Sequence, residues 1–194
     1  MKINLDSIKK YCEKRDNEVK EAIKRAKKAG VHPTFMKLLE TQGKINLKHK
    51  LPLVLHDGAT EEQIVKFEEA MDVTIPAPYR ELLKFTNGAK LGEASVEFFG
   101  LQENKNSLYT LYTINDADKI ENISGVIENN WLIIGEDIAS NLICISLETG
   151  EIYSWDYRNI GDEECFLNTD FYTYLEEDLI GFMYEIEREG IKND

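Results

Sequence analysis

Apolar residues recur at helical spacing in the stretch that follows Thr60. Ile64, Phe67 and Met71 are three or four positions apart, which places them on one face of a helix. Gln63 stands three residues after Thr60. At this spacing a threonine hydroxyl and a glutamine side chain cap a helix start reciprocally. The pattern predicts a helix that begins just after Thr60 and ends at Met71.

Two prolines predict a break and then a second helix. Proline disrupts a helix interior but suits the first turn, so Pro76 and Pro78 favour a helix that begins near Pro78. Asn87 and Gly88 predict its end, because glycine readily adopts the left-handed conformation found after helices. The residues expected on its inward face are Tyr79, Leu82, Leu83 and Phe85.

After Gly88 the hydrophobic pattern changes to a period of two, which is typical of strands. A loop that ends at Gly150 predicts a hairpin between the last two of them. Short connections favour antiparallel pairing, and helices precede and follow the strands. We therefore expect an α+β fold with a mostly antiparallel sheet of about five to six strands flanked by helices. The predicted strands are 96–99, 108–112, 131–135, 141–146 and 151–155.

Helical patterns return at both ends of the chain. One long amphipathic helix is expected over 5–29, with Gly30 as its stop, and a shorter helix is expected from Pro33 to Gly43. An acidic amphipathic helix is expected over 171–188. The intervening segment 44–58 includes a short strand near 51–55. We interpret the chain as a helical extension, residues 1–50, followed by an α+β domain, residues 51–194.

Charge divides the chain at the same place. Residues 1–50 hold 14 Lys and Arg against 6 Asp and Glu, a net charge of +8, whereas residues 51–194 hold 9 against 30, a net charge of −21. A strongly acidic body repels nucleic acid and attracts basic proteins. The basic extension lacks arginine clusters and interleaved aromatic residues, so we expect it to dock on the protein itself and to bind no nucleic acid.

No motif in the sequence points to catalysis or to a cofactor. Glycine-rich phosphate loops and nucleophile elbows are missing, and the three histidines show no metal-ligand spacing with the cysteines. Clustered carboxylates leave a two-carboxylate hydrolase as an alternative, although their abundance alone does not create the two environments that acid–base chemistry needs. We expect no enzyme activity, no cofactor and no metal.

Targeting signals are missing from the pattern as well. No apolar run has the length of a membrane span, and the first residues lack the apolar middle region of a secretory signal. The three cysteines form no C-x-x-C pair, which fits reduced thiols. The expectation is a cytoplasmic protein with no membrane partner.

The order of these motifs resembles the SUKH superfamily, also called the SMI1/KNR4 family. The resemblance begins with the capped helix, Ile75 and Pro76 followed by Tyr79, and the closing Asn87 and Gly88. It continues through the tryptophan-led strand at 131–135 and the helix led by a phenylalanine, and spans about residues 59–179. Bacterial members are known as immunity proteins that bind and neutralise toxins, many of them nucleases. Fungal members imply the alternative of a general protein-interaction scaffold.

The resemblance and the charge together suggest how this protein would act. We expect it to neutralise a basic toxin domain, a nuclease, by covering the substrate groove of the toxin with an acidic surface, and to do so as a monomer or weak homodimer. Aromatic anchors would add binding energy, with Tyr109 as one candidate and Trp155 as either an anchor or a core residue. The residues expected to contact the partner are Glu136, Asp137, Trp155, Asp156, Tyr157, Asp162, Glu163 and Glu164.

Overall fold

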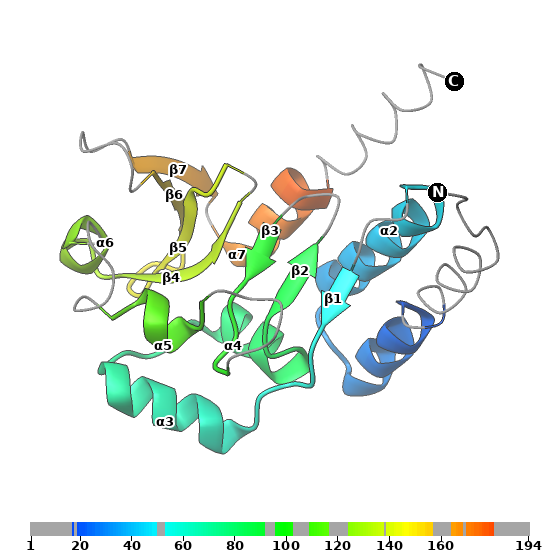
Figure 1. Ribbon diagram of the computed structural model, residues 1–194, viewed down its shortest axis with the longest axis horizontal. Coiled ribbons are helices and arrows are strands. Elements are labelled where there is room, and N and C mark those ends of the chain that lie inside the picture. The colour runs from blue at the N-terminus through cyan, green and yellow to red at the C-terminus, as the bar shows by residue number, and fades with distance from the viewer. Residues whose placement is uncertain are drawn as a thin grey trace, which may run out of the picture.

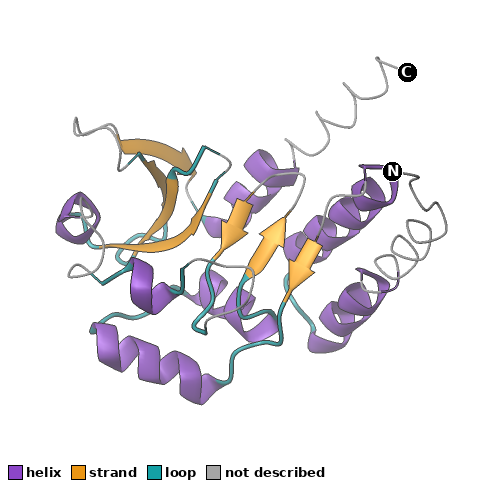
Figure 2. Cartoon of the chain, viewed as in Figure 1, coloured by secondary structure: helices purple, strands orange, loops and turns teal. Residues whose placement is uncertain are grey.

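The computed structural model of the protein describes residues 17, 19–49, 53–91, 96–102, 109–116, 124–137, 139–156, 164–168 and 170–180. Within them, one seven-stranded antiparallel sheet is flanked by helices, and the strands follow one another across the sheet in chain order (Figures 1 and 2). The α+β class and the antiparallel sheet are confirmed. The strands are β1 (Leu53–Leu55), β2 (Ala89–Leu91), β3 (Val96–Phe98), β4 (Trp131–Glu136), β5 (Leu142–Ser146), β6 (Ile152–Trp155) and β7 (Glu164–Asn168).

One predicted strand is wrong. The segment expected as a strand over 108–112 enters a short helix, α5 (Leu111–Ile114). Thr110 and Thr113 cap this helix reciprocally through side chain and backbone, which gives its few amides local partners. The sheet also gains β2 and β7, which the period-two pattern did not reveal because both strands are short and carry polar residues.

The two central helices form as their caps predict. In α3 (Glu61–Met71) the Thr60 hydroxyl accepts from the Gln63 amide at 3.2 Å, and the Gln63 side chain accepts from the Thr60 amide at 2.8 Å. The helix α4 (Ala77–Phe85) follows Pro76 directly, and Gly88 beyond its end has φ +96°. Tyr79 and Leu82 are 0% and 5% exposed, so the predicted inward face of α4 is confirmed.

The N-terminal helices pack on the same core as the sheet. Residues 19–29 are helical and end at Gly30, while residues 5–16 lie outside the described residues. The next helix, α2 (Pro33–His49), continues through Gly43, where the sequence pattern predicted its end. Glycine also tolerates helical backbone angles, at a cost of about 1 kcal/mol relative to alanine, so it does not by itself stop a helix.

The C-terminal segment is shorter, within the described residues, than its pattern predicted. The helix α7 (Phe171–Tyr174) passes directly into one π-helical segment, η1 (Leu175–Ile180). Asp170 caps α7, accepting from the amides of Tyr172 and Thr173 at 2.9 and 3.0 Å. The remainder of the predicted helix, 181–188, lies outside the described residues.

Aromatic rings join these helices to one face of the sheet. Phe171 of α7 lies edge to face against Phe98 of β3 and Tyr79 of α4, with both centroid distances at 5.6 Å. Phe35 of α2 reaches the same ring at 6.0 Å. The core therefore includes the N-terminal helical region, α4 and α7 together.

Tyr79 also bridges β3 and β4, the neighbouring strands with the fewest register pairs in the described sheet. Strands β3 and β4 share only two register pairs, at Glu97 and Phe98. The Tyr79 hydroxyl lies beside this junction and is shared between the carbonyl oxygens of Phe99 at 2.6 Å and Ile134 at 2.9 Å. Burial raises the pKa of Tyr79 well above its usual value, so the donating proton is retained.

Replacing Tyr79 with phenylalanine is expected to lower the free energy of unfolding by about 1–2 kcal/mol. The ring stays, but the Phe99 carbonyl loses its donor, whereas the Ile134 carbonyl still accepts from the Phe99 amide at 2.9 Å. Chemical denaturation would measure the change. Tyr112→Phe is the matched control, because that ring packs on Phe67 at 4.9 Å without a hydroxyl partner among the described residues. Equal losses in the two variants would contradict the proposed role of the Tyr79 hydroxyl.

Candidate protein-binding surface

The strand register aligns several of the expected contact residues in one row across the sheet. Glu97 of β3 lies opposite Glu136 at the end of β4, which lies opposite Leu142 of β5. Leu142 in turn pairs with Trp155 of β6, and Trp155 with Glu164 of β7. Directly opposed residues share a face of a sheet. Glu136, Trp155 and Glu164 thus occupy one cross-strand row, and Glu164 belongs to a strand where a loop was expected.

At the acidic end of this row, two negatively charged residues lie opposite each other. The side chain of Glu97 is only 12% exposed, and it forms an ion pair with the Lys90 ammonium at 3.4 Å. Burial, and then the charge of Glu97, raise the pKa of Glu136 above its ordinary value, against a smaller lowering effect of the Lys90 charge. Two carboxylates directly opposite each other on neighbouring strands destabilise the free protein. Sequence reasoning selected Glu136 but missed Glu97, because only the register brings the pair together.

Replacing Glu136 with glutamine is expected to stabilise the protein at neutral pH by roughly 0.2–1 kcal/mol. A carboxyl whose pKa is raised by folding favours the folded state only while it is protonated, and that contribution disappears as pH rises through the raised pKa. Replacing Glu136 with the uncharged glutamine removes the negative charge and so restores this stabilising contribution at neutral pH. Thermal unfolding across a pH series would show the gain at pH 7 and its disappearance in acid. A gain that persists unchanged in acid would contradict this explanation.

Asp137 has a local structural role beside this row. Its carboxylate accepts from the amides of Ala139 at 2.8 Å and Asn141 at 2.9 Å, and from the Asn141 side chain at 3.0 Å. Ser140 adopts φ +62° in the same turn. Asp137 therefore contributes charge to this corner while its oxygens hold the link between β4 and β5.

Trp155 packs inside the protein more than the anchor interpretation expected. The edge of its ring lies over Gly125 of α6 (Ser124–Glu128), where an added Cβ would meet the ring at 2.4 Å. Its ring lies edge to face with Trp131 at 6.3 Å, and Trp131 stacks on Tyr153 at 4.1 Å. The Trp155 indole nitrogen is buried and has no hydrogen-bond partner among the described residues. Trp155 is thus partly exposed and shares an aromatic cluster.

The other expected contact residues are divided between described and undescribed parts of the chain. Asp156 is partly exposed and follows β6 directly. Tyr109 is partly exposed and packs edge to face on Phe99 at 6.0 Å. Three expected residues lie outside the described residues: Tyr157, Asp162 and Glu163.

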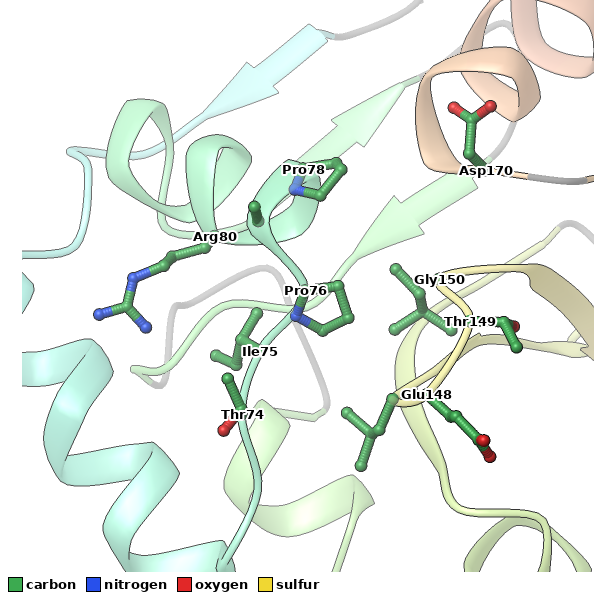
Figure 3. Close-up of a pocket in the computed structure, with 12 residues that line it drawn as sticks. Thr74, Ile75, Pro76, Pro78, Arg80, Glu148, Thr149, Gly150 and Asp170 are labelled. Carbon is green, nitrogen blue, oxygen red and sulfur yellow. The ribbon is translucent and has the colours of Figure 1, made fainter.

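A groove that sequence reasoning missed lies at the opposite end of β5. It has a volume of about 600 Å³ and runs between the link from α3 to α4 and the β5–β6 hairpin (Figure 3). Ile75 and Ile145 form its buried apolar floor, and Pro76 stands on the wall opposite the hairpin. In the sequence, Ile75 and the two prolines predict a helix start and carry part of the family resemblance, but they do not indicate a groove.

An ion-pair network fixes one wall of this groove. The Arg80 guanidinium contacts the carboxylates of both Glu61 and Glu68, joining α4 to α3. Glu68 also accepts from the Ile75 amide at 2.9 Å. The hydrogen bonds that Arg80 donates to Glu68 and Glu61 raise its pKa against the effect of its burial. The wall is therefore held from two helices.

Chemistry beyond binding has little support within the residues that the structure describes. No group of three or more potential metal ligands occurs there. Cys144 is fully buried, and burial raises the pKa of its thiol far above the ordinary value, so the reactive thiolate is disfavoured. None of the described helices combines the length and the apolar character needed to cross a membrane.

Comparison with known proteins supports the resemblance of the motifs. A family model described as the SMI1 / KNR4 family (SUKH-1) matches residues 58–177, which is more than half of the chain. No curated protein matches the sequence. The match begins just before the capped helix α3 and ends within η1, so it contains the cross-strand row, the groove and the Tyr79 junction. This chain belongs to the SMI1/KNR4 family (SUKH-1).

Proposed function

We propose that this protein is an immunity-type binding protein that neutralises a basic toxin domain, a nuclease being the type of toxin its charge fits best. It would act in the cytoplasm by covering the substrate groove of the toxin, without catalysis and without a cofactor. Family membership supports the immunity class, because SUKH proteins are known as immunity-type proteins. The finer statements rest on charge and on the cross-strand row.

The opposed pair of Glu97 and Glu136 is the observation that carries the proposal. These side chains keep two like charges close together, and Lys90 offsets their repulsion only in part, as expected where function takes precedence over stability. A guanidinium or ammonium group from a partner would relieve this repulsion on binding. Nucleases are basic because they hold phosphates, and the net charge of −21 on residues 51–194 would steer such a partner toward the surface.

The basic N-terminal region fits this proposal as a docked element. Val19, Ala26 and Phe35 are buried in the common core, which leaves their helices attached to the acidic body. Lys37 of α2 also pairs with Glu176 of η1. We propose that this region binds no nucleic acid and that the protein acts as a monomer or weak homodimer. The proposed contact residues outside the described part remain Tyr157, Asp162 and Glu163.

Co-expression with a toxin encoded beside this gene tests the proposal. We expect cells that produce both proteins to survive, and the two proteins to purify as a stoichiometric complex. Cell death despite soluble, abundant immunity protein would contradict neutralisation. If instead the protein captures a non-toxic partner and no toxin, the alternative of a protein-interaction scaffold of the SMI1/KNR4 type is favoured.

Charge reversal locates the surface within that complex. Glu136→Lys is expected to slow association by about tenfold at low salt and to weaken its salt dependence, because steering acts mainly on the rate of encounter. Glu69→Lys on the exposed side of α3 is the matched control, since it changes the net charge equally at another place. Stopped-flow measurement of both variants separates local steering from net charge. Equal slowing in the two variants would exclude the cross-strand row as the contact surface.

A further inference from the structure

We propose that the groove between residues 74–80 and the β5–β6 hairpin is a second docking site, which receives an extended segment of a basic protein. One branched apolar side chain of that segment would enter the groove, with a lysine or arginine beside it. The basic nature of the occupant rests on the proposed function, whereas the shape of the site rests on the groove itself.

The groove has an apolar floor that an incoming side chain can cover. Ile75 and Ile145 are 2% and 0% exposed and form its base. Pro76 and Leu147 line it and remain partly exposed. Figure 3 shows Pro76 between Ile75 and the hairpin residue Gly150, so the two walls face each other across the hollow. A volume of about 600 Å³ exceeds what one side chain needs, which suits a side chain together with its backbone.

The wall of the groove offers a backbone donor. Pro76 at the N-cap position of α4 supplies no side-chain cap and Pro78 has no N–H, so the Ala77 amide has no side-chain acceptor within the part of the chain that the structure describes. Ala77 is the first residue of α4, is exposed and lines the groove. Its amide is therefore placed to donate to a carbonyl oxygen of an extended segment, as in other modes of peptide recognition.

The charges at the groove favour a cationic neighbour. Arg80 is already neutralised by two carboxylates, so it does not repel a cation. Glu148 is exposed at the hairpin tip and has no ion pair within the described residues. Asp170 stays ionised: burial opposes its charge, but hydrogen bonds from Thr173 and Tyr172 lower its pKa overall. Two carboxylates on the rim therefore complement a lysine or arginine beside the apolar anchor.

Peptide titration of the full-length protein tests the groove without any toxin. The probe is the peptide acetyl-Gly-Lys-Leu-Lys-Gly-amide. Its binding is followed at low salt by mapping the changes in the amide chemical shifts of the protein. We expect saturable shifts at Thr74, Ala77 and Thr149, with a Kd of about 1 mM. Two matched peptides replace leucine with glycine or both lysines with glutamate, and we expect neither to produce these shifts. No shifts with the first peptide, or equal shifts with all three, would overturn the proposal.

Two variants keep the test specific to the groove. Ala77→Tyr should fill the groove and weaken binding of the leucine peptide by about tenfold or more. Ala70→Tyr is the matched control at an exposed position of α3, and it should bind as the unmodified protein does. Glu148→Lys should weaken binding by about three- to tenfold at low salt through lost charge complementarity. Unchanged binding in both Ala77→Tyr and Glu148→Lys would place the peptide elsewhere.

The two proposals fail in distinguishable ways. If a toxin complex forms and Ala77→Tyr leaves it intact while peptide shifts are also missing, the groove inference is wrong and the proposed function stands. If the peptide binds in the groove and no toxin associates, the groove inference stands and the immunity function is wrong.

Discussion

Replacing Gly100 with alanine is expected to lower the free energy of unfolding by about 3 kcal/mol or more, because the added methyl group has no space. A Cβ at this position would lie 2.2 Å from the backbone oxygen of Asn87 and 2.6 Å from its carbonyl carbon. Those atoms belong to the backbone and cannot rotate away as a long side chain would. For a chain of this size the loss corresponds to a fall in melting temperature of about 6–12 °C.

The backbone around Gly100 cannot easily move away from Asn87, because Asn87 is hydrogen-bonded to two other segments of the chain. Its side-chain oxygen accepts from the Leu101 amide at 2.6 Å, and its own amide donates to the Asp57 carbonyl at 3.2 Å. Gly100 itself accepts from the Leu111 amide at 2.9 Å, where α5 begins. Moving either backbone to admit a methyl group would strain or break these buried bonds.

Gly150→Ala is the matched control for this prediction. Its φ of +77° also suits glycine, but an added Cβ would meet nothing within 4 Å. The expected loss is about 1–2 kcal/mol, from backbone strain alone. Thermal and chemical unfolding of both variants would separate strain from steric overlap. A Gly100→Ala variant no less stable than Gly150→Ala would show that the close approach to Asn87 is easily relaxed.

Local signals in the sequence predicted the helices well where a cap accompanied the apolar stripe. Thr60 with Gln63, and Pro76 before Tyr79, each combine a backbone signal with a buried face, and both helices begin where expected. Gly43 carried a backbone signal alone, and α2 continues through it. A glycine permits a helix to stop, but only packing and the following residues decide whether it does.

The candidate surface could not be predicted because it depends on register. In β4 the residues Trp131 and Ile133 pair with Ser146 and Cys144, and a bulge then shifts Glu136 onto the position opposite Leu142. Strict alternation from Trp131 would have placed Glu136 on the other face of the sheet. The same registers bring Glu97 beside it from a strand that precedes β4 by more than thirty residues. Sequence reasoning therefore identified members of the row without identifying the row.

Replacing Leu82 with alanine is expected to destabilise the protein by about 2–5 kcal/mol, as for other buried leucines. Leu82 is 5% exposed on the inner face of α4. It lines a small apolar cavity of about 20 Å³, which Phe35, Leu38 and Phe98 also line. Apolar cavities of this kind stay dry, so water would not compensate for the lost side chain. Denaturant unfolding would measure the loss.

The same substitution should also loosen the N-terminal region, because the cavity lies between α4, the sheet and α2. Truncating Leu82 would enlarge a gap that Phe35 and Leu38 already border, and these are the residues by which α2 is buried. Hydrogen exchange is expected to rise at the amides of α2 more than at those of α3. Val65→Ala is the control, since that side chain is 37% exposed on α3 and alanine favours a helix. A stability loss in Leu82→Ala no greater than in Val65→Ala would contradict the assigned packing. Faster exchange in α3 with α2 unchanged would show that α2 docks independently of this contact.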